Sequence, residues 1–153
     1  MSMKKYLTRL VLVYLCVNIG LMLTAIIANT QTISGKDDNG NAVRSVFNDV
    51  ENGIINNDID LIAQHFSKQI SLSVPGTESG FYSANQAISI LRNYFNYRHI
   101  VSFILSTRQL AGEIPYATGA GYYSSHGKRE SFQIYTALKR AHGVWIITQF
   151  NVY

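Results

Sequence analysis

The sequence predicts an α+β domain in which helices pack against one face of an antiparallel sheet. Apolar residues recur at spacings of three and four over residues 42–54 and again over residues 83–96, which is typical of amphipathic helices. Residues 99–153 then contain four strand-like runs separated by short turns, and short connections make consecutive strands antiparallel neighbours. The length of 153 residues favours a single domain.

The first 30 residues are an export signal or a membrane anchor. Lys4, Lys5 and Arg9, with no acidic residue among them, precede an apolar run over residues 10–28. This run exceeds the apolar core of about 7 to 15 residues of most cleavable signals and fits the roughly 17 to 25 needed to span a bilayer. Ala28 and Thr30 nevertheless offer the small residues that a signal peptidase recognises, so cleavage and retention both stay open. Either way, the basic residues predict that the rest of the chain lies outside the cytoplasm, in the periplasm or anchored at the membrane.

Charge and cysteine content exclude several function classes for the exported part. The exported part contains no thiol, because Cys16, the single cysteine, lies within the apolar run. Disulfides and cysteine-ligated metals are therefore excluded there. Without its three N-terminal basic residues, the chain keeps 10 of 13 basic residues against 9 acidic ones, a net charge of +1. The two remaining basic pairs, at 128–129 and 139–140, stand at opposite ends of one predicted strand, so we expect no nucleic-acid surface.

Residues 31–41 are polar and contain glycine, which predicts a linker, and the folded domain is expected over residues 42–153. From Ala42, a first helix presents one apolar face. Asn57 or Asp58 can cap a second, short helix, because both side chains accept hydrogen bonds from a helix N-terminus. Its inward residues are Leu61, Ile62 and Phe66.

Residues 69–74 alternate apolar and polar side chains, which predicts a half-buried strand that ends at the turn Pro75–Gly76. Phe81 and Tyr82 are expected to form a short returning strand. Ser83 and Gln86 then have the spacing of a capping box, in which each side chain bonds the backbone amide of the other. A long helix should therefore begin at Ser83, and its apolar stripe needs a partner surface.

Four strands are expected over residues 99–109, 116–125, 131–140 and 144–153. The connections at Gly127 and at His142–Gly143 are tight turns. Gly119 and Gly121 fall on one face of the second of these strands. Their missing side chains allow a bulge, sharp curvature or a close approach by the long helix.

Five segments of this sequence resemble a bacterial family of exported domains of unknown function. They are LIAQHF (61–66), ISLSVPG (70–76), YSANQAISIL (82–91), YATGAGYYSSHG (116–127) and VWIITQFNV (144–152). The resemblance covers about residues 42–153. It implies a nuclear transport factor 2-like (cystatin-like) fold, in which N-terminal helices are wrapped by a strongly curved antiparallel sheet to form a cone.

Enzymes of that fold, of the ketosteroid isomerase and scytalone dehydratase types, place an acidic or histidine base beside hydrogen-bond donors inside the cone. This sequence supplies donors but hardly a base, since its nine acidic residues fall in predicted helix starts, polar helix faces or turns. His65 is either a structural residue at the edge of the core or a base. The four histidines lack ligand spacing, so we expect neither a metal nor a cofactor, and we assign no catalytic residue.

Tyrosines near the helix–sheet interface make a ligand pocket the best site hypothesis. Tyr94 and Tyr135 are expected to line a hollow left open by the two glycines, with apolar rings and a few donors. Gln149, like Gln133, stands where a strand would by default carry an apolar residue. The pocket candidates are Tyr94, Tyr135, Gly119, Gly121, Gln149 and His65.

Three functions remain open from the sequence. The first is a non-enzymatic binding domain of the cell envelope, holding a small apolar ligand inside the cone or binding an envelope protein or a second copy through the open sheet face. The second is an isomerase or dehydratase. The third is a scaffold of an envelope complex, anchored in the membrane by residues 10–28 if the signal is not cleaved.

Overall fold

A computed structural model of the chain describes residues 38–153. The predicted signal or anchor over residues 1–30, and most of the predicted linker, lie outside the described residues. Within the described part of the chain, no helix has the length and apolar character needed to cross a membrane. The fold that follows is that of the compact unit Gly40–Tyr153.

An N-terminal helix occupies residues 38–55 and therefore begins earlier than the predicted start at Ala42. The additional residues include Gly40, which costs a helix about 1 kcal/mol relative to alanine, and burial of Val43 and Phe47 further along the helix outweighs that cost. The short helix α2 spans Ile59–Ala63, and the Asp58 side chain caps it by accepting from the Leu61 amide at 3.2 Å. Phe66 was expected on this helix but begins the first strand instead.

The long helix α3 spans Ala84–Asn96 and begins with the predicted capping box. The Ser83 amide donates to Gln86 Oε1 at 2.9 Å, and the Gln86 amide donates to Ser83 Oγ at 3.4 Å. The apolar stripe faces the sheet, as the sequence predicts. Its buried members are Ala87, Leu91, Tyr94 and Phe95.

Six strands form one sheet in the order β2-β1-β6-β5-β4-β3. Their bounds are β1 Phe66–Ser73, β2 Gly80–Ser83, β3 His99–Gln109, β4 Tyr116–Ser125, β5 Lys128–Ala141 and β6 Val144–Val152. Four of the five pairs are antiparallel, but β1 and β6 are parallel. The sheet is therefore mixed, whereas the prediction was an antiparallel one. The turn rule that predicted antiparallel neighbours applies only to strands joined by short loops, and residues 74–143, with four strands and a helix, separate β1 from β6.

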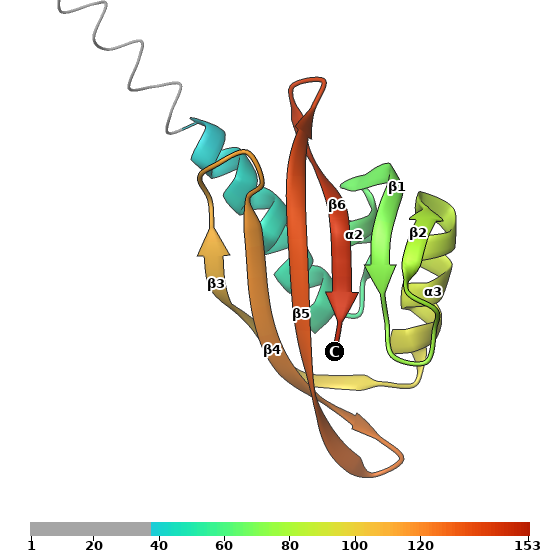
Figure 1. Cartoon of the computed structure of the whole chain (residues 1–153). Helices are drawn as coiled ribbons and strands as arrows, with labels where there is room; N and C mark the ends of the chain where they lie inside the picture. Colours follow the sequence, from blue (N-terminus) through green and yellow to red (C-terminus); the bar gives the residue numbers. More distant parts are fainter. Residues whose placement is uncertain (1–37) are drawn as a thin grey trace, which may run out of the picture. The chain divides into compact units, whose positions relative to one another are not determined.

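The helices cover one face of the curved sheet, which we call the inner face, and leave the other, outer face without helices (Figure 1). Phe95 of α3 contacts Phe132 of β5, with ring centroids 6.1 Å apart. Alternate strand residues such as Ile70, Phe132 and Phe150 are buried on the inner face. Because side chains alternate along a strand, their neighbours lie on the outer face.

Strand β5 begins at Lys128, three residues before the predicted start at residue 131. The connection from β4 is a two-residue turn in which His126 and Gly127 have φ values of 51° and 77°, as hairpins of this length require. Register pairing reaches the turn itself, with Ser125 opposite Lys128. Glu130 is therefore part of a strand, which corrects the expectation that no acidic residue lies within a strand.

Candidate functional site

The space over the two glycines of β4 is filled on the inner face. Gly121 lies in register between Phe103 and Phe132, whose rings stack over it with centroids 5.5 Å apart and planes at 12°. A Cβ on Gly121 would meet the Ser102 carbonyl oxygen and lie 2.9 Å from the Phe132 ring, and one on Gly119 would lie 2.8 Å from the Phe103 ring. The glycines thus serve close approach and curvature, and the hollow expected over them is occupied by aromatic rings.

Tyr94 is buried at the end of α3, where it belongs to a cluster of aromatic and charged side chains on the inner side. The Arg98 guanidinium lies 3.8 Å from the centre of the Tyr94 ring and 5.1 Å from that of Tyr123. The Tyr123 hydroxyl donates to Glu130 Oε2 at 2.8 Å. Burial raises the pKa of Tyr94 above its ordinary value, while Arg98 opposes that rise.

His65 lies in the turn between α2 and β1 and connects neighbouring elements. Its Nε2 is 2.8 Å from Asp49 Oδ2 on the N-terminal helix, and its carbonyl oxygen accepts from the Ile147 amide at 2.6 Å.

Tyr135 and Gln149 are half-buried on the outer face, where Tyr135 stacks with Tyr116. The structure thus separates Tyr94 from Tyr135 by the thickness of the sheet, and the six sequence candidates do not form one site.

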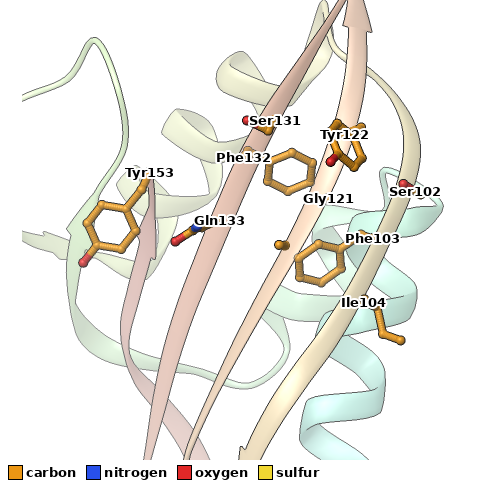
Figure 2. A pocket seen from close by; sticks show the side chains of 10 residues that line it. Ser102, Phe103, Ile104, Gly121, Tyr122, Ser131, Phe132, Gln133 and Tyr153 are labelled. Atoms are coloured by element: carbon orange, nitrogen blue, oxygen red, sulfur yellow. The ribbon is translucent and has the colours of Figure 1, made fainter.

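The outer face instead carries an open hollow of about 760 Å³ over β3, β4 and β5 (Figure 2). An adjoining hollow of about 330 Å³ shares Ala120, Gln133 and Tyr153 with it. Three large side chains in the first hollow are well exposed, namely Ile104 at 63%, Tyr122 at 46% and Tyr153 at 63%.

Three of the sequence candidates do line these hollows. Gly121 contributes to the larger one, and Gly119 and Tyr135 contribute to the smaller one. Since the glycine Cβ positions point inward, the two glycines offer only backbone to the outer face. Sequence reasoning missed Ile104, Ala120 and Tyr153, although alternation against the buried Phe103 and Leu105 was a signal that Ile104 faces outward.

The side chains that line the larger hollow are uncharged. At its rim, beside Tyr122, the Arg129 guanidinium lies 4.3 Å from the centre of the Tyr122 ring. Tyr153 is fixed by Asn151, whose Nδ2 donates to the tyrosine hydroxyl at 3.0 Å. The backbone of Tyr153 pairs with that of Gln133 in both directions, at 3.0 and 2.9 Å. The aromatic rings at this site are therefore held by specific neighbours.

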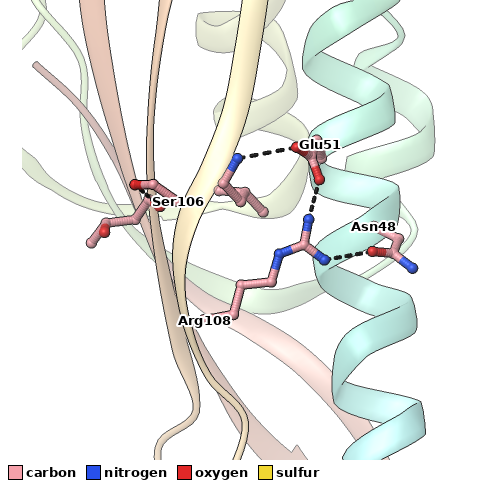
Figure 3. Close-up of polar contacts among 6 residues, drawn as sticks. Asn48, Glu51, Ser106 and Arg108 are labelled. Carbon is pink, nitrogen blue, oxygen red and sulfur yellow. Dashed lines mark hydrogen bonds and ion pairs between the residues drawn. The ribbon is translucent and has the colours of Figure 1, made fainter.

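A polar network holds β3, one wall of the hollow, against the N-terminal helix (Figure 3). A register shift between Leu105 and Thr107 interrupts the pairing of β3 with β4, and the Leu105 amide donates to Glu51 Oε1 at 3.1 Å. Arg108 forms an ion pair with Glu51 and donates to Asn48 Oδ1 at 2.6 Å. Glu51 therefore satisfies a backbone donor at the irregular part of the strand.

Among residues 38–153, no three histidine, cysteine or acidic side chains gather in a way that could hold a metal ion. The described residues thus offer polar and aromatic contacts at the hollow and no cluster of metal ligands.

The arrangement of helices and curved sheet defines a domain of the nuclear transport factor 2-like class. A ketosteroid isomerase-like protein from Erwinia carotovora atroseptica superposes with a TM-score of 0.59 at 12% identity, over 72% of this chain and 92% of its own. An epoxide hydrolase of the LEH-like type from M. tuberculosis gives 0.57 at 14% identity, over 76% and 84%. At such identities, the likeness concerns the fold alone.

Residues 47–152 match the family described as Domain of unknown function (DUF4783), and the chain belongs to this family. A DUF4783 family protein from Bacteroides ovatus ATCC 8483 has a TM-score of 0.58 and 14% identity, over 67% of this chain and 89% of its own. No curated protein matches the sequence. The resemblance inferred from the five sequence segments is confirmed in both family and fold.

Proposed function

We propose that this protein is a non-catalytic binding domain and that its binding site is the hollow on the outer face of the sheet. The observation that carries the proposal is the open volume of about 760 Å³, within the range of roughly 300 to 1,000 Å³ typical of ligand sites. Ile104, Tyr122 and Tyr153 are exposed there although burial of such side chains is favourable. A bound ligand would cover them.

The outer face is a better site than the inner one because the inner face is committed to packing. Phe132 contacts both Phe95 and Phe103 there, and the rings of Phe103 and Phe132 fill the space over Gly121. A ligand inside would have to displace core side chains, whereas a ligand on the outer face displaces only solvent.

We also propose that the domain acts outside the cytoplasm, in the cell envelope. Support comes from the basic residues that precede the apolar run over residues 10–28. If this run is retained, the domain is tethered to the membrane, and a role as an anchored scaffold becomes compatible with the same binding face. The mass of the mature protein in membrane and soluble fractions separates the cleaved form from the anchored one.

The second candidate function is an isomerase- or dehydratase-type reaction, and the pair Tyr123–Glu130 favours it. A carboxylate beside a hydroxyl is what proton transfer at such a site requires, and the two groups are 2.8 Å apart. Glu130 is exposed, however, and Tyr123 is buried. A steroid or epoxide substrate turned over by the wild type and not by Glu130→Gln would establish this alternative in place of the binding proposal.

Native mass spectrometry of the full-length protein, purified from its own host, tests the binding proposal. Ala120 lies in both hollows, so Ala120→Arg should obstruct them. The matched control is Ser89→Arg, on the exposed side of α3. We expect a retained ligand in the wild type and in Ser89→Arg, and its loss in Ala120→Arg. Retention by Ala120→Arg, or no ligand in any of the three, contradicts the proposal.

A further inference from the structure

Outer-face side chains form two parallel rows across the strands at the hollow. Register pairing aligns Ser102, Tyr122 and Ser131 in one row. It aligns Ile104, Ala120 and Gln133 in the next row, which the backbone pairing of Gln133 extends to Tyr153, the residue after β6. One tyrosine therefore stands in each row, two strands apart, and small side chains lie between them.

The Cα atoms of Tyr122 and Tyr153 are about 12 Å apart, from two strand spacings in one direction and two residues in the other. Both rings are preorganised, because Arg129 stacks on Tyr122 and Asn151 bonds the hydroxyl of Tyr153. An exposed aromatic side chain that is already fixed loses little conformational entropy when a ligand covers it. This spacing is too large for a ligand with one small ring to contact both tyrosines, and it suits a ligand made of several linked rings.

Polar groups with free hydrogen-bonding capacity lie between and beside the tyrosines: Gln133 and Ser131 stand on β5 between them, and Ser102 stands on β3 on the other side of Tyr122. The side-chain amide of Gln133 makes no hydrogen bond with another described residue, nor do the hydroxyls of Ser102 and Ser131. An amide offers both donors and acceptors, and a hydroxyl offers one donor and two acceptors. Such groups match a ligand whose own groups are hydroxyls.

We propose that the outer-face hollow binds a neutral oligosaccharide. This inference rests on the proposed function and names its ligand class. The apolar faces of two sugar rings would stack on Tyr122 and Tyr153, the intervening hydroxyls would bond Gln133 and Ser131, and Ser102 would bond the ligand on the other side of Tyr122. Ala120 keeps the middle of the path low enough for a continuous chain to cross it.

Charge and shape favour this ligand over the others that the face could accept. An anionic polymer would need several cations, and the lining supplies none beyond Arg129 at the rim. A lipid chain would leave Gln133 and both serines without partners, which is costly on burial. A protein partner or a second copy is expected to meet a flatter and more apolar patch, since Ile104 is the one large aliphatic side chain among the residues that line the larger hollow.

The test is calorimetric titration of the full-length protein with neutral hexasaccharides of glucose, mannose, xylose and N-acetylglucosamine, with polygalacturonate as the anionic comparison. Tyr122→Ala and Tyr153→Ala should each weaken binding of a neutral hexasaccharide about tenfold or more, and Ala120→Arg should abolish it. Tyr97→Ala is the matched control, because Tyr97 is 75% exposed at the end of α3. Melting temperatures of all variants establish that each is folded.

Support for the inference is binding of a neutral sugar that is lost in the face variants and kept in Tyr97→Ala. This binding should also be unchanged between about 50 and about 500 mM salt, over which the Debye length falls roughly threefold. Four outcomes overturn it: no neutral sugar binds, binding survives the face variants, only polygalacturonate binds, or the wild type dimerises through this face and Ala120→Arg alone is monomeric.

Failure of this inference is distinguishable from failure of the proposed function. If no sugar binds but the host-derived ligand is still lost in Ala120→Arg and kept in Ser89→Arg, the binding site stands and its ligand class is wrong. If Ala120→Arg retains the host-derived ligand, the site itself is wrong.

Discussion

Replacing Gly121 with alanine should destabilise the domain, although alanine is ordinarily better tolerated in a strand. The added Cβ would meet the Ser102 carbonyl oxygen, which belongs to the neighbouring strand, and would lie 2.9 Å from two carbon atoms of the Phe132 ring. Overpacking of this kind costs about 1 to 3 kcal/mol. The smaller conformational freedom of unfolded alanine returns about 0.4 to 1 kcal/mol. The net expectation is a loss of roughly 1 to 2 kcal/mol.

For a domain of this size, such a loss lowers the melting temperature by roughly 4 to 10 °C. The assay is thermal and urea unfolding of the full-length protein followed by circular dichroism. Gly80→Ala is the control, because its Cβ would have Tyr82 as nearest neighbour at 3.9 Å and its φ is not positive. If Gly121→Ala melted at or above the temperature of Gly80→Ala, the close approach of β3 to β4 would be refuted. The argument that the glycines serve packing would then fail.

Four further changes test other parts of the fold by the same unfolding assays. Glu51→Ala should cost about 1 to 3 kcal/mol, because it removes the acceptor of the Leu105 amide and the ion-pair partner of Arg108; a neutral result would refute the network. Ser83→Ala should cost about 1 kcal/mol as a lost cap, with the exposed Ser89→Ala near neutral; the reverse ranking would contradict the helix start. Thr136→Val should stabilise by about 1 kcal/mol, since the fully buried hydroxyl has no partner among described residues; destabilisation would refute this. Because burial raises the pKa of Tyr94, this tyrosine ionises at a lower pH in the unfolded chain than in the folded one, and the free energy of unfolding falls as the pH rises above 10. The Tyr94→Phe variant should therefore lose less stability between pH 8 and 11 than the wild type does. An equal loss in the two proteins would count against this.

The elements of this fold were predictable from the sequence where local chemistry decides them. Ser83 and Gln86 specify the start of α3 because a capping box depends on residues three apart. The bounds of β3 and β4 agree with the predicted strands because glycine and proline turns limit them. The parallel pair β1·β6 was not predictable in this way, because no local signal records which distant strand pairs with β1.

The site was harder to predict because it depends on which face each strand residue occupies. The sequence predicts that both Tyr94 and Tyr135 lie near the helix–sheet interface, yet they lie on opposite sides of the sheet. The periodicity of β4 is hidden by Gly119 and Gly121, which are buried without contributing side chains. Tyr153 was predicted to close the last strand, but its exposure depends on its pairing beside Gln133 at the sheet surface.

The same glycines that close the inner face also shape the outer one. With no Cβ at Gly121, Phe103 and Phe132 stack on the inner side, so the strand curves and its backbone becomes part of the floor of the outer hollow. A larger residue there would separate β3 from β4 and displace Ser102 and Ile104 of β3 from Tyr122 and Ala120 of β4, which they face across the hollow. The destabilised Gly121→Ala variant should therefore also bind the ligand of this face more weakly, even at temperatures where it remains folded. Equal affinity in Gly121→Ala and Gly80→Ala would show that packing on the inner face and binding on the outer face are independent.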